Sequence, residues 1–432
     1  MKKFLKLSLL LLLFIVVLGS CTKVENGKFI NIKDGKFQKN GESYYYVGTN
    51  FWYGGILGSL GQGGDRARLT KELDLLSSIG VKNLRVIVGA DGDARTSKVQ
   101  PSLQLSPGVY NDTLLQGLDY LLVELRKRDM EAVLFLNNSW EWSGGYSQYL
   151  EWAGKGVAPV PAETSWDVFR SYVTEFAVCR EAQELFFNYV RDIVGRTNSI
   201  SGVKYSEEPA IMAWQIGNEP RAFSDKNKEP FKEWVLECAT LIKSLDKNHL
   251  VSVGSEGEKG CEEDIELFEA IHQDKNIDYL TIHCWPKNWS WIDIENIEGT
   301  LQNAITETTL YLDRHSKVAQ RVNKPMVLEE FGFPRDGYDF RKDVSATTQR
   351  DLYYSAVFNL ITKNMKEGGH FAGCNFWAWG GYGEPEHLNW QMGDDYVGDP
   401  PQEPQGLNSI FASDISTLEI IKSTTKQQYV KL

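Results

Sequence analysis

Residues 212–221 read MAWQIGNEPR, and the character of this stretch changes halfway along its length. Its first half is a run of apolar side chains, which is typical of a β-strand buried on both faces. The second half is polar, and Glu219 stands there between an asparagine and a proline. Because proline has no N–H for a strand ladder, the strand should end at this point. The stretch therefore predicts a buried strand that carries a carboxylate at its carboxyl end.

Seven further runs have the same buried-strand character, and helical stretches separate them. The runs cover 44–52, 83–90, 131–138, 250–257, 278–285, 325–332 and 373–381. The first helical stretch, RARLTKELDLLSSIG (66–80), has leucines at helical spacing and stops at a glycine, and one long helix is expected over 171–196. Eight strands alternating with eight helices predict an α/β fold, a (β/α)8 TIM barrel with enlarged βα loops. A doubly wound sheet is the alternative, which the lack of a glycine-rich dinucleotide turn in the sequence disfavours.

Composition and charge exclude several classes of function. The net charge is −12 and no basic block follows the N-terminus, so nucleic acid is not an expected partner. No H-E-x-x-H or H-x-H pattern occurs, so we expect no metal site.

The cysteines after the N-terminal segment are scattered, which argues against a disulfide framework, although one bridging pair remains an open alternative. They are Cys179, Cys238, Cys261, Cys284 and Cys374.

The N-terminal 21 residues have the pattern of a targeting segment. Three lysines precede an apolar run over 7–18, which is short for a membrane-spanning helix. The run ends in LGSC (18–21), which resembles the lipobox of bacterial lipoproteins and implies lipidation of Cys21. An ordinary secretory signal is the alternative. We expect an exported protein that is lipid-anchored at the bacterial cell envelope, on the outer membrane or the cell surface, and whose only membrane contact is this anchor.

Polar and aromatic side chains stand at the ends of the predicted strands. Since active sites of (β/α)8 barrels lie at the carboxyl ends of the strands, these side chains should meet at one mouth. Each residue alone is also explained by a structural role, as a rim residue, an ion-pair partner or a core aromatic. The set as a whole predicts an active site. Its members are Trp52, Arg85, Asn138, Trp140, Asn218, Glu219, Arg221, His283, Trp285, Glu329, Glu330 and Trp377.

Glu219 and Glu330, on the fourth and seventh predicted strands, suit glycoside hydrolysis. One carboxylic acid protonates the leaving oxygen, and a second carboxylate attacks the anomeric carbon or activates water. We expect Arg85 to keep Glu330 ionised, aromatic walls to keep Glu219 protonated, and His283 to position Glu219. A gap of about 5–5.5 Å between the carboxyl groups would mean retention, and about 6.5–9.5 Å would mean inversion.

The segments QIGNEPR, VLEEFG, TIHCWPKNW, NLRV, GTNFW and NFWAWG together resemble glycoside hydrolase family 5, of clan A. NEPR and IHCWPKNW resemble its β-mannanase branch, mannan endo-1,4-β-mannosidase, over about residues 40–385. The resemblance implies that Glu219 is the acid/base and Glu330 the nucleophile, with retention of configuration and no cofactor. It implies that substrate contacts come from Trp52, Arg85, Asn138, Trp140, Asn218, Arg221, His283, Trp285 and Trp377.

Two features depart from the pattern of this family. Many members have a tyrosine where this chain has Trp285, and that tyrosine donates a hydrogen bond to the nucleophile. The Trp285 indole either donates this hydrogen bond through its N–H or only stacks on the sugar. Ser139 is inserted before Trp140, where mannanases often have Asn-Asn-Trp, so the roles of Asn138 and Trp140 are less defined.

The expected activity is that of a monomeric, retaining endo-β-1,4-mannanase acting on mannan, glucomannan or galactomannan. The alternatives are an exo-acting β-mannosidase or mannobiohydrolase, a β-1,4-glucanase of the same family, and a non-catalytic glycan-binding lipoprotein. The expected domains are a signal peptide over 1–20, a tether and entry segment over 21–40, and a single catalytic barrel over 41–432.

Overall fold

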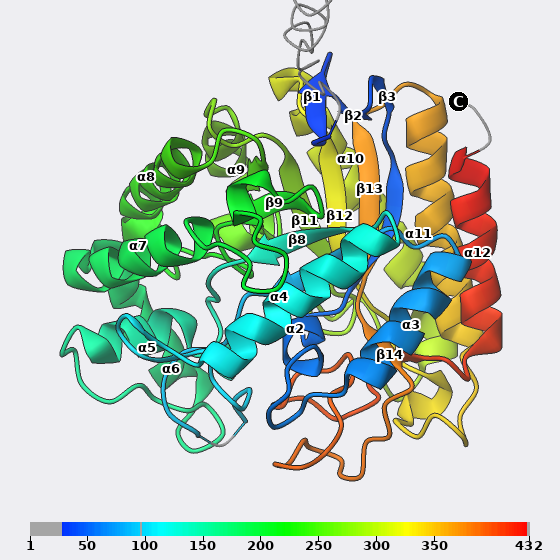
Figure 1. Ribbon diagram of the computed structural model, residues 1–432. Helices are drawn as coiled ribbons and strands as arrows, with labels where there is room; N and C mark the ends of the chain where they lie inside the picture. The colour runs from blue at the N-terminus through cyan, green and yellow to red at the C-terminus, as the bar shows by residue number, and fades with distance from the viewer. Residues whose placement is uncertain (1–27, 96, 430–432) are drawn as a thin grey trace, which may run out of the picture.

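The computed structural model describes residues 28–95 and 97–429, and a parallel eight-stranded barrel lies at its centre (Figure 1). All eight strands fall within the predicted runs or start up to two residues before them, and their side chains are buried on both faces. The strands are β4 (Tyr46–Asn50), β5 (Asn83–Ile87), β8 (Glu131–Phe135), β9 (Ile211–Gln215), β10 (Leu250–Ser252), β11 (Leu280–Cys284), β12 (Met326–Phe331) and β13 (Phe371–Phe376). The prediction of a (β/α)8 barrel is therefore confirmed.

The strand order around the barrel is β10-β9-β8-β5-β4-β13-β12-β11, with parallel pairing throughout. Two backbone hydrogen bonds bridge the remaining gap between the β10 and β11 regions. The N–H of Asp278 donates to the carbonyl of Val251 at 2.8 Å, and the N–H of His283 donates to Glu256 at 3.1 Å. Consequently the carboxyl ends of all eight strands surround one mouth.

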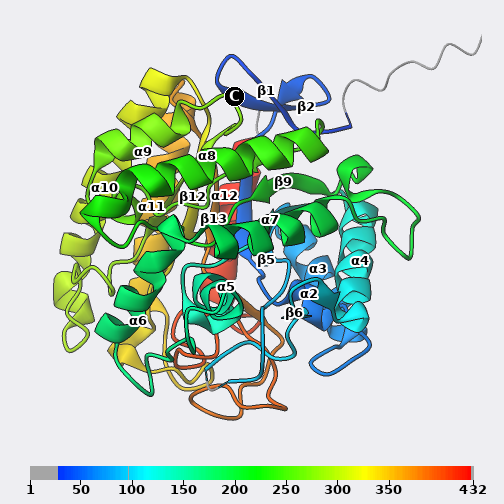
Figure 2. The same cartoon turned by 90° about the vertical axis from the view of Figure 1, so that its left-hand side faces the viewer.

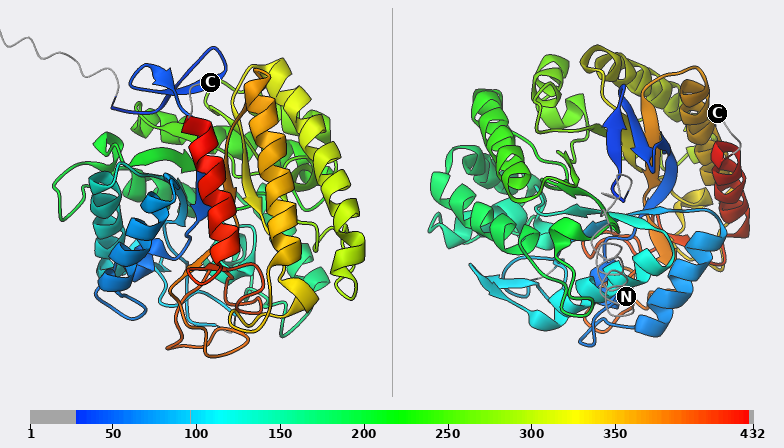
Figure 3. Two further views of the ribbon diagram at one scale, coloured as in Figure 1. Left: turned by 90° about the vertical axis from the view of Figure 1, so that its right-hand side faces the viewer. Right: turned by 45° about the horizontal axis from the view of Figure 1, so that its top comes forward.

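Helices form the outer layer of the molecule (Figure 2). Eight of them lie near their predicted positions: α3 (Arg66–Ser78), α4 (Asp112–Lys127), α7 (Arg180–Val194), α8 (Lys228–Leu245), α9 (Ile265–His272), α10 (Ile297–Val322), α11 (Thr348–Lys366) and α12 (Ile415–Tyr429). Side-chain caps define several starts, such as Asp65, which accepts from the N–H of Arg68 before α3. Figure 3 shows α10, α11 and α12 side by side in yellow, orange and red. None of the helices in the described part of the chain is both long and apolar enough to cross a bilayer.

The single helix predicted over 171–196 is broken in two. α6 (Trp166–Val173) runs into a 3₁₀ turn (Thr174–Val178), and α7 starts after Cys179, whose backbone is extended. The side-chain amide of Gln183 in α7 donates to the carbonyls of Phe176 and Ala177 at 3.0 Å and so stabilises the break. The five cysteines of the described chain are all buried and free, so the alternative of one bridging pair is not realised among them.

The segment predicted as a tether is partly folded. Three short antiparallel strands, β1 (Asn31–Lys33), β2 (Lys36–Lys39) and β3 (Glu42–Ser43), lie across the end of the barrel opposite the mouth (Figure 1). Ile30 and Phe37 are buried here, and Phe37 packs edge-on against Tyr279 at 5.3 Å. Burial of these apolar side chains explains why the folded domain starts before residue 41. The predicted signal peptide and Cys21 lie outside the described residues.

The βα loops on the mouth side are long and contain short elements of their own. These are α2 (Gly54–Leu57), β6 (Gln104–Ser106), β7 (Val109–Tyr110), α5 (Gly145–Trp152), β14 (Trp379–Gly381) and β15 (Ile410–Phe411). The long segment between β14 and β15, referred to below as the loop over 382–410, supplies Pro400, Gln402 and Glu403 to the mouth.

Candidate active site

Glu219 and Glu330 come from strands on different sides of the barrel and meet at the mouth. Glu330 lies in β12, and Glu219 follows β9 with a backbone φ of +50°. A left-handed backbone is uncommon for a residue with a side chain and tends to occur at functional sites. Oxygen atoms of the two carboxylates and a ring nitrogen of His283 all lie within 4.8 Å of one another. Oxygen atoms this close fit a retaining pair, whose carboxyl groups lie about 5–5.5 Å apart, better than the wider spacing of an inverting pair.

Arg85, in β5, holds Glu330 from below. Its guanidinium forms an ion pair with Glu330, and both groups are buried. Its other N–H groups donate to Gln215 at 2.8 Å, Asn218 at 2.9 Å and Asn50 at 3.1 Å. The planar fork of arginine therefore connects four side chains from the ends of three strands, β4, β9 and β12, and fixes the position of Glu330.

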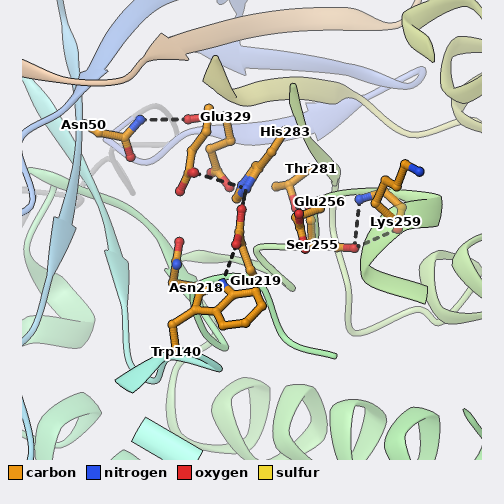
Figure 4. Close-up of polar contacts among 12 residues, drawn as sticks. Asn50, Trp140, Asn218, Glu219, Ser255, Glu256, Lys259, Thr281, His283 and Glu329 are labelled. Atoms are coloured by element: carbon orange, nitrogen blue, oxygen red, sulfur yellow. Dashed lines mark hydrogen bonds and ion pairs between the residues drawn. The ribbon is translucent and has the colours of Figure 1, made fainter. Parts of the chain in front are cut away.

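Glu219 lies between His283 and Trp140 (Figure 4). One oxygen contacts Nδ1 of His283 at 2.8 Å, and the other accepts from the indole N–H of Trp140 at 2.5 Å. The same His283 nitrogen lies 3.3 Å from Glu330. His283 thus stands between the two carboxyl groups and sets their spacing.

The charges of this group follow from burial and from these contacts. Burial raises the pKa of Glu219, against the effects of Arg221 and of hydrogen bonds from Trp140 and other donors. Burial also raises the pKa of Glu330, against the effect of Arg85, and the nearby carboxylates add to the rise. Two carboxylates this close do not both ionise, so the pair holds one proton.

The two carboxyl groups have different charged surroundings. Burial lowers the pKa of His283 well below its ordinary value, so the imidazole is neutral near pH 7. Glu219 receives direct contacts from neutral groups, whereas the Arg85 guanidinium contacts Glu330. The strongest direct cationic contact of the pair is therefore on Glu330.

The pair opens into a cleft of about 880 Å³. Of the predicted binding residues, Trp140, Asn218, Arg221, Trp285 and Trp377 line it. Trp285 and Trp377 pack edge to face at 5.8 Å. The nearby Trp285 helps to lower the pKa of Glu219. Trp285 thus lies beside Glu219 and lines the cleft.

The other predicted binding residues do not line the cleft. The prediction that Trp52 contacts substrate is wrong: its side chain is fully buried, and its indole N–H donates to the carbonyl of Gly398 at 2.8 Å. Asn138 is also buried; its side-chain oxygen accepts from the Trp140 backbone N–H at 3.0 Å and from Asn218 at 3.2 Å. Asn138 therefore positions Asn218 and Trp140.

Arg85 and His283 are correctly placed at the site, but they touch the two glutamates and are fully buried. The two residues therefore position the carboxyl groups and do not make the direct substrate contact that had been expected of them. Glu329 points the other way from its neighbour, as predicted from strand alternation, and accepts from Gln215 at 2.7 Å.

Sequence reasoning missed most of the outer cleft. The additional lining residues come from α6, from the loops after β10 and β11, and from the loop over 382–410, and they include Trp166, Arg170, Glu256, Lys259, Trp289, Gln402 and Glu403. Glu256 forms an ion pair with Arg221, which lies over the Trp140 ring at 5.4 Å. Burial raises the pKa of Glu256, and of Glu403, to about 7. In the sequence, only the WPKNW segment and the length of the inserted loops indicated that residues outside the strand ends line the cleft.

Two groups in the described residues place ligand atoms close enough to hold a metal ion. The first is Glu219, His283 and Glu330, where the Arg85 guanidinium already supplies the positive charge beside Glu330. The second is Glu386, His387 and Asp394 on the loop over 382–410, where Nδ1 of His387 contacts Asp394 at 2.9 Å.

A (β/α)8 barrel with a buried acid and a carboxylate at the retaining spacing, open to an aromatic-lined cleft, defines a glycoside hydrolase. Residues 27–431 match the family model described as GH family 5 beta-mannosidase-like, and the chain belongs to this family.

Relatives and solved structures agree with this assignment. The chain is 30% identical to mannan endo-1,4-beta-mannosidase 7 of Arabidopsis thaliana over 86% of its own length and 83% of that protein. A glycoside hydrolase family 5 mannosidase from Rhizomucor miehei, in complex with mannosyl-fructose, superposes with a TM-score of 0.85 at 35% identity, covering 93% and 97% of the two chains. The endo-beta-1,4-mannanase from Thermotoga petrophila superposes with a TM-score of 0.64 at 25% identity, covering 90% and 77%.

Proposed function

We propose that this glycoside hydrolase cleaves β-1,4-mannosidic bonds of mannan, glucomannan or galactomannan with retention of configuration. The observation that carries the proposal is the spacing of Glu219, His283 and Glu330 within 4.8 Å, with Arg85 on Glu330. Mannose as the sugar is supported by the relatives, which are named mannan endo-1,4-beta-mannosidase or mannosidase.

The contacts support a double displacement in two steps. Glu330 attacks the anomeric carbon while the glycosidic C–O bond breaks, and Glu219 transfers its proton to the leaving oxygen. In the second step Glu219, now ionised, takes a proton from water, the water oxygen attacks the same carbon, and the ester bond to Glu330 breaks. His283 and Trp140 hold Glu219 for both proton transfers, because each contacts one of its oxygens.

Cleavage within the chain, the endo mode, is supported by the curated relatives. Several of those named mannan endo-1,4-beta-mannosidase are 27–30% identical and match the chain over most of their length. The aromatic faces of Trp140, Trp285 and Trp377 along an open cleft suit a polymeric sugar.

One observation favours a second candidate, removal of sugars from the chain end. Among the described residues that line the cleft, none comes from the loops after β4 or β5. Above these strands lies an aromatic plug (Trp52, Trp142 and Tyr396), in which the Trp52 ring is 5.6 Å from Trp142 and 5.2 Å from Tyr396. The backbone N–H of Gln100 donates to the Tyr396 hydroxyl at 2.9 Å and joins the loops over 88–111 and 382–410. A cleft that is closed here admits only chain ends.

Product analysis on mannohexaose and polymeric mannan separates the two modes. Mixed short oligosaccharides support internal cleavage, whereas mannose or mannobiose as the only early product supports the exo mode. Strong hydrolysis of soluble cellulose derivatives without mannan cleavage would replace the mannanase proposal by a β-1,4-glucanase. Full turnover by Glu330→Ala would refute the mechanism for either sugar.

We also propose that the chain is a monomer that is exported and lipid-anchored through Cys21 at the bacterial cell envelope. Export and the lipid anchor are supported by the N-terminal pattern of lysines, an apolar run and LGSC. Metabolic labelling with a fatty acid should mark the protein and not a Cys21→Ser variant. Equal labelling of both, or a dimer in sedimentation of the mature chain, would contradict the respective parts of this proposal.

A further inference from the structure

Trp166 is a large aromatic side chain that stays exposed at the rim of the cleft. It is the first residue of α6, 45% of its surface is accessible, and it lines the cleft. Its ring meets Trp140 edge-on, with centroids 5.9 Å apart and planes at 85°. Phe169 also packs edge-to-face with the Trp166 ring, with centroids 5.9 Å apart, and the exposed fraction shows that part of the indole stays open to solvent beside these two contacts. A flat apolar face in a sugar-binding cleft is suited to stack on a pyranose ring.

The contacts of Glu219 show on which side of the scissile bond Trp166 lies. One Glu219 oxygen faces His283, which also contacts Glu330, so this side belongs to the sugar that is attacked. The other oxygen faces Trp140, and Trp166 packs against the Trp140 ring. Since the acid must reach the oxygen between the two sugars, Trp140 and Trp166 lie beyond it, on the leaving-group side.

Polar side chains also line the cleft. Lys259 pairs with Glu263 at 2.6 Å and lies 5.8 Å from the centre of the Trp289 ring. Arg170, one turn after Trp166 on α6, is exposed and lines the cleft as well. Donors and acceptors together with an aromatic face are the combination that binds sugar hydroxyls around a stacked ring.

We propose that Trp166 is the stacking platform for the second sugar on the leaving-group side, with Arg170 as a hydrogen-bond donor to that sugar. Trp140 occupies the space directly beside Glu219, so Trp166 contacts the next unit outward. The enzyme should therefore prefer substrates with at least two sugars beyond the cleaved bond. This inference rests on the proposed function for the position of the bond but not on the identity of the sugar.

The test compares kcat/KM for substrates of different length between the wild-type enzyme and the Trp166→Ala variant. Values of kcat/KM are measured on 4-nitrophenyl β-mannopyranoside, which has no sugar beyond the bond, and on mannobiose, mannotriose and mannotetraose. The ratio of kcat/KM for mannotetraose to that for the aryl mannoside should fall by about tenfold, chiefly through KM. Trp166→Phe keeps a flat ring and should restore a large part of this ratio.

Val168→Ala is the matched control, because Val168 lies on the same helix, is 49% exposed and is not among the described residues that line the cleft. It should leave every ratio unchanged. An equal loss on all substrates in Trp166→Ala would overturn the platform and show that Trp166 only supports Trp140. An unchanged ratio would overturn it as well. If the wild type cleaves cello- rather than manno-oligosaccharides, the proposed function fails, and the same ratio measured on the cello series still decides the role of Trp166.

Discussion

Replacing Arg85 by lysine keeps a positive charge near Glu330 but removes the planar fork. The guanidinium donates to three neutral side-chain oxygens, on Gln215, Asn50 and Asn218, in addition to its ion pair with Glu330. Lysine has one nitrogen and does not span these positions. At about 1 kcal/mol for each of the three hydrogen bonds, the variant should lose about 3 kcal/mol. This loss corresponds to about a hundredfold decrease in kcat/KM if the full effect is felt in the transition state.

The pH profile gives a second, independent readout of the same substitution. Arg85 lowers the pKa of Glu330, so a weaker contact raises it. The acid limb of kcat/KM reports the ionisation of the nucleophile in the free enzyme. In Arg85→Lys this limb should therefore move to higher pH, as measured with an aryl β-mannoside across the acid range.

Arg350→Lys is the control for the loss of buried hydrogen bonds alone. Arg350, in α11, is fully buried and donates to the carbonyls of Phe333, Ser409 and Leu407 at 2.7–3.1 Å. This variant should lose a similar amount of stability in urea denaturation but keep the acid limb in place. The reasoning is refuted if Arg85→Lys loses only a few-fold in kcat/KM, or if both variants shift the acid limb equally.

Two further changes test the charge assignments in the cleft and beside it. Glu219→Ala should lower kcat/KM on mannotetraose by about 10²–10⁴-fold and an activated dinitrophenyl β-mannoside far less. Added azide should give a β-mannosyl azide detectable by NMR, and an α-azide would contradict retention. Burial raises the pKa of Glu141 to about 7, and one of its oxygens has no hydrogen-bond partner in the described structure. Because this folded-state pKa lies above the unfolded value of about 4.5, the wild type should lose stability as the pH rises between these values. Glu141→Gln should remove up to about 3 kcal/mol of that loss, whereas parallel urea stabilities of the two proteins at pH 4 and pH 8 would contradict the assignment.

Sequence reasoning worked for features that depend on local periodicity and on the topology of the barrel. Buried strands have an unmistakable apolar pattern, and the barrel rule then places their last residues at one mouth. Glu219, Glu330 and Arg85 could be brought together in this way, because their positions depend on the strand that carries each one. Trp377 was likewise found at the end of β13 and does line the cleft.

Features that depend on contacts between distant loops could not be predicted. Trp52 and Trp140 both follow a strand and have similar sequence surroundings, yet one is buried and the other lines the cleft. The difference arises because Gly398, about 350 residues later, accepts the hydrogen bond of Trp52 and the loop over 382–410 covers it. No periodicity in either segment indicates this contact. The break between α6 and α7, which depends on Gln183, is a similar case.

The burial of Trp52 also affects which aromatic side chains can bind substrate. A tryptophan after the first barrel strand would be available to stack on sugars on the attacked side of the bond if the mouth were open above β4 and β5. In this chain it forms part of the aromatic plug with Trp142 and Tyr396, and only Trp142 of the three also lines the cleft. Trp166, which is 45% exposed, lines the cleft and is assigned above to the leaving-group side. On that assignment its open ring offers binding energy to a long substrate in either of the two cleavage modes.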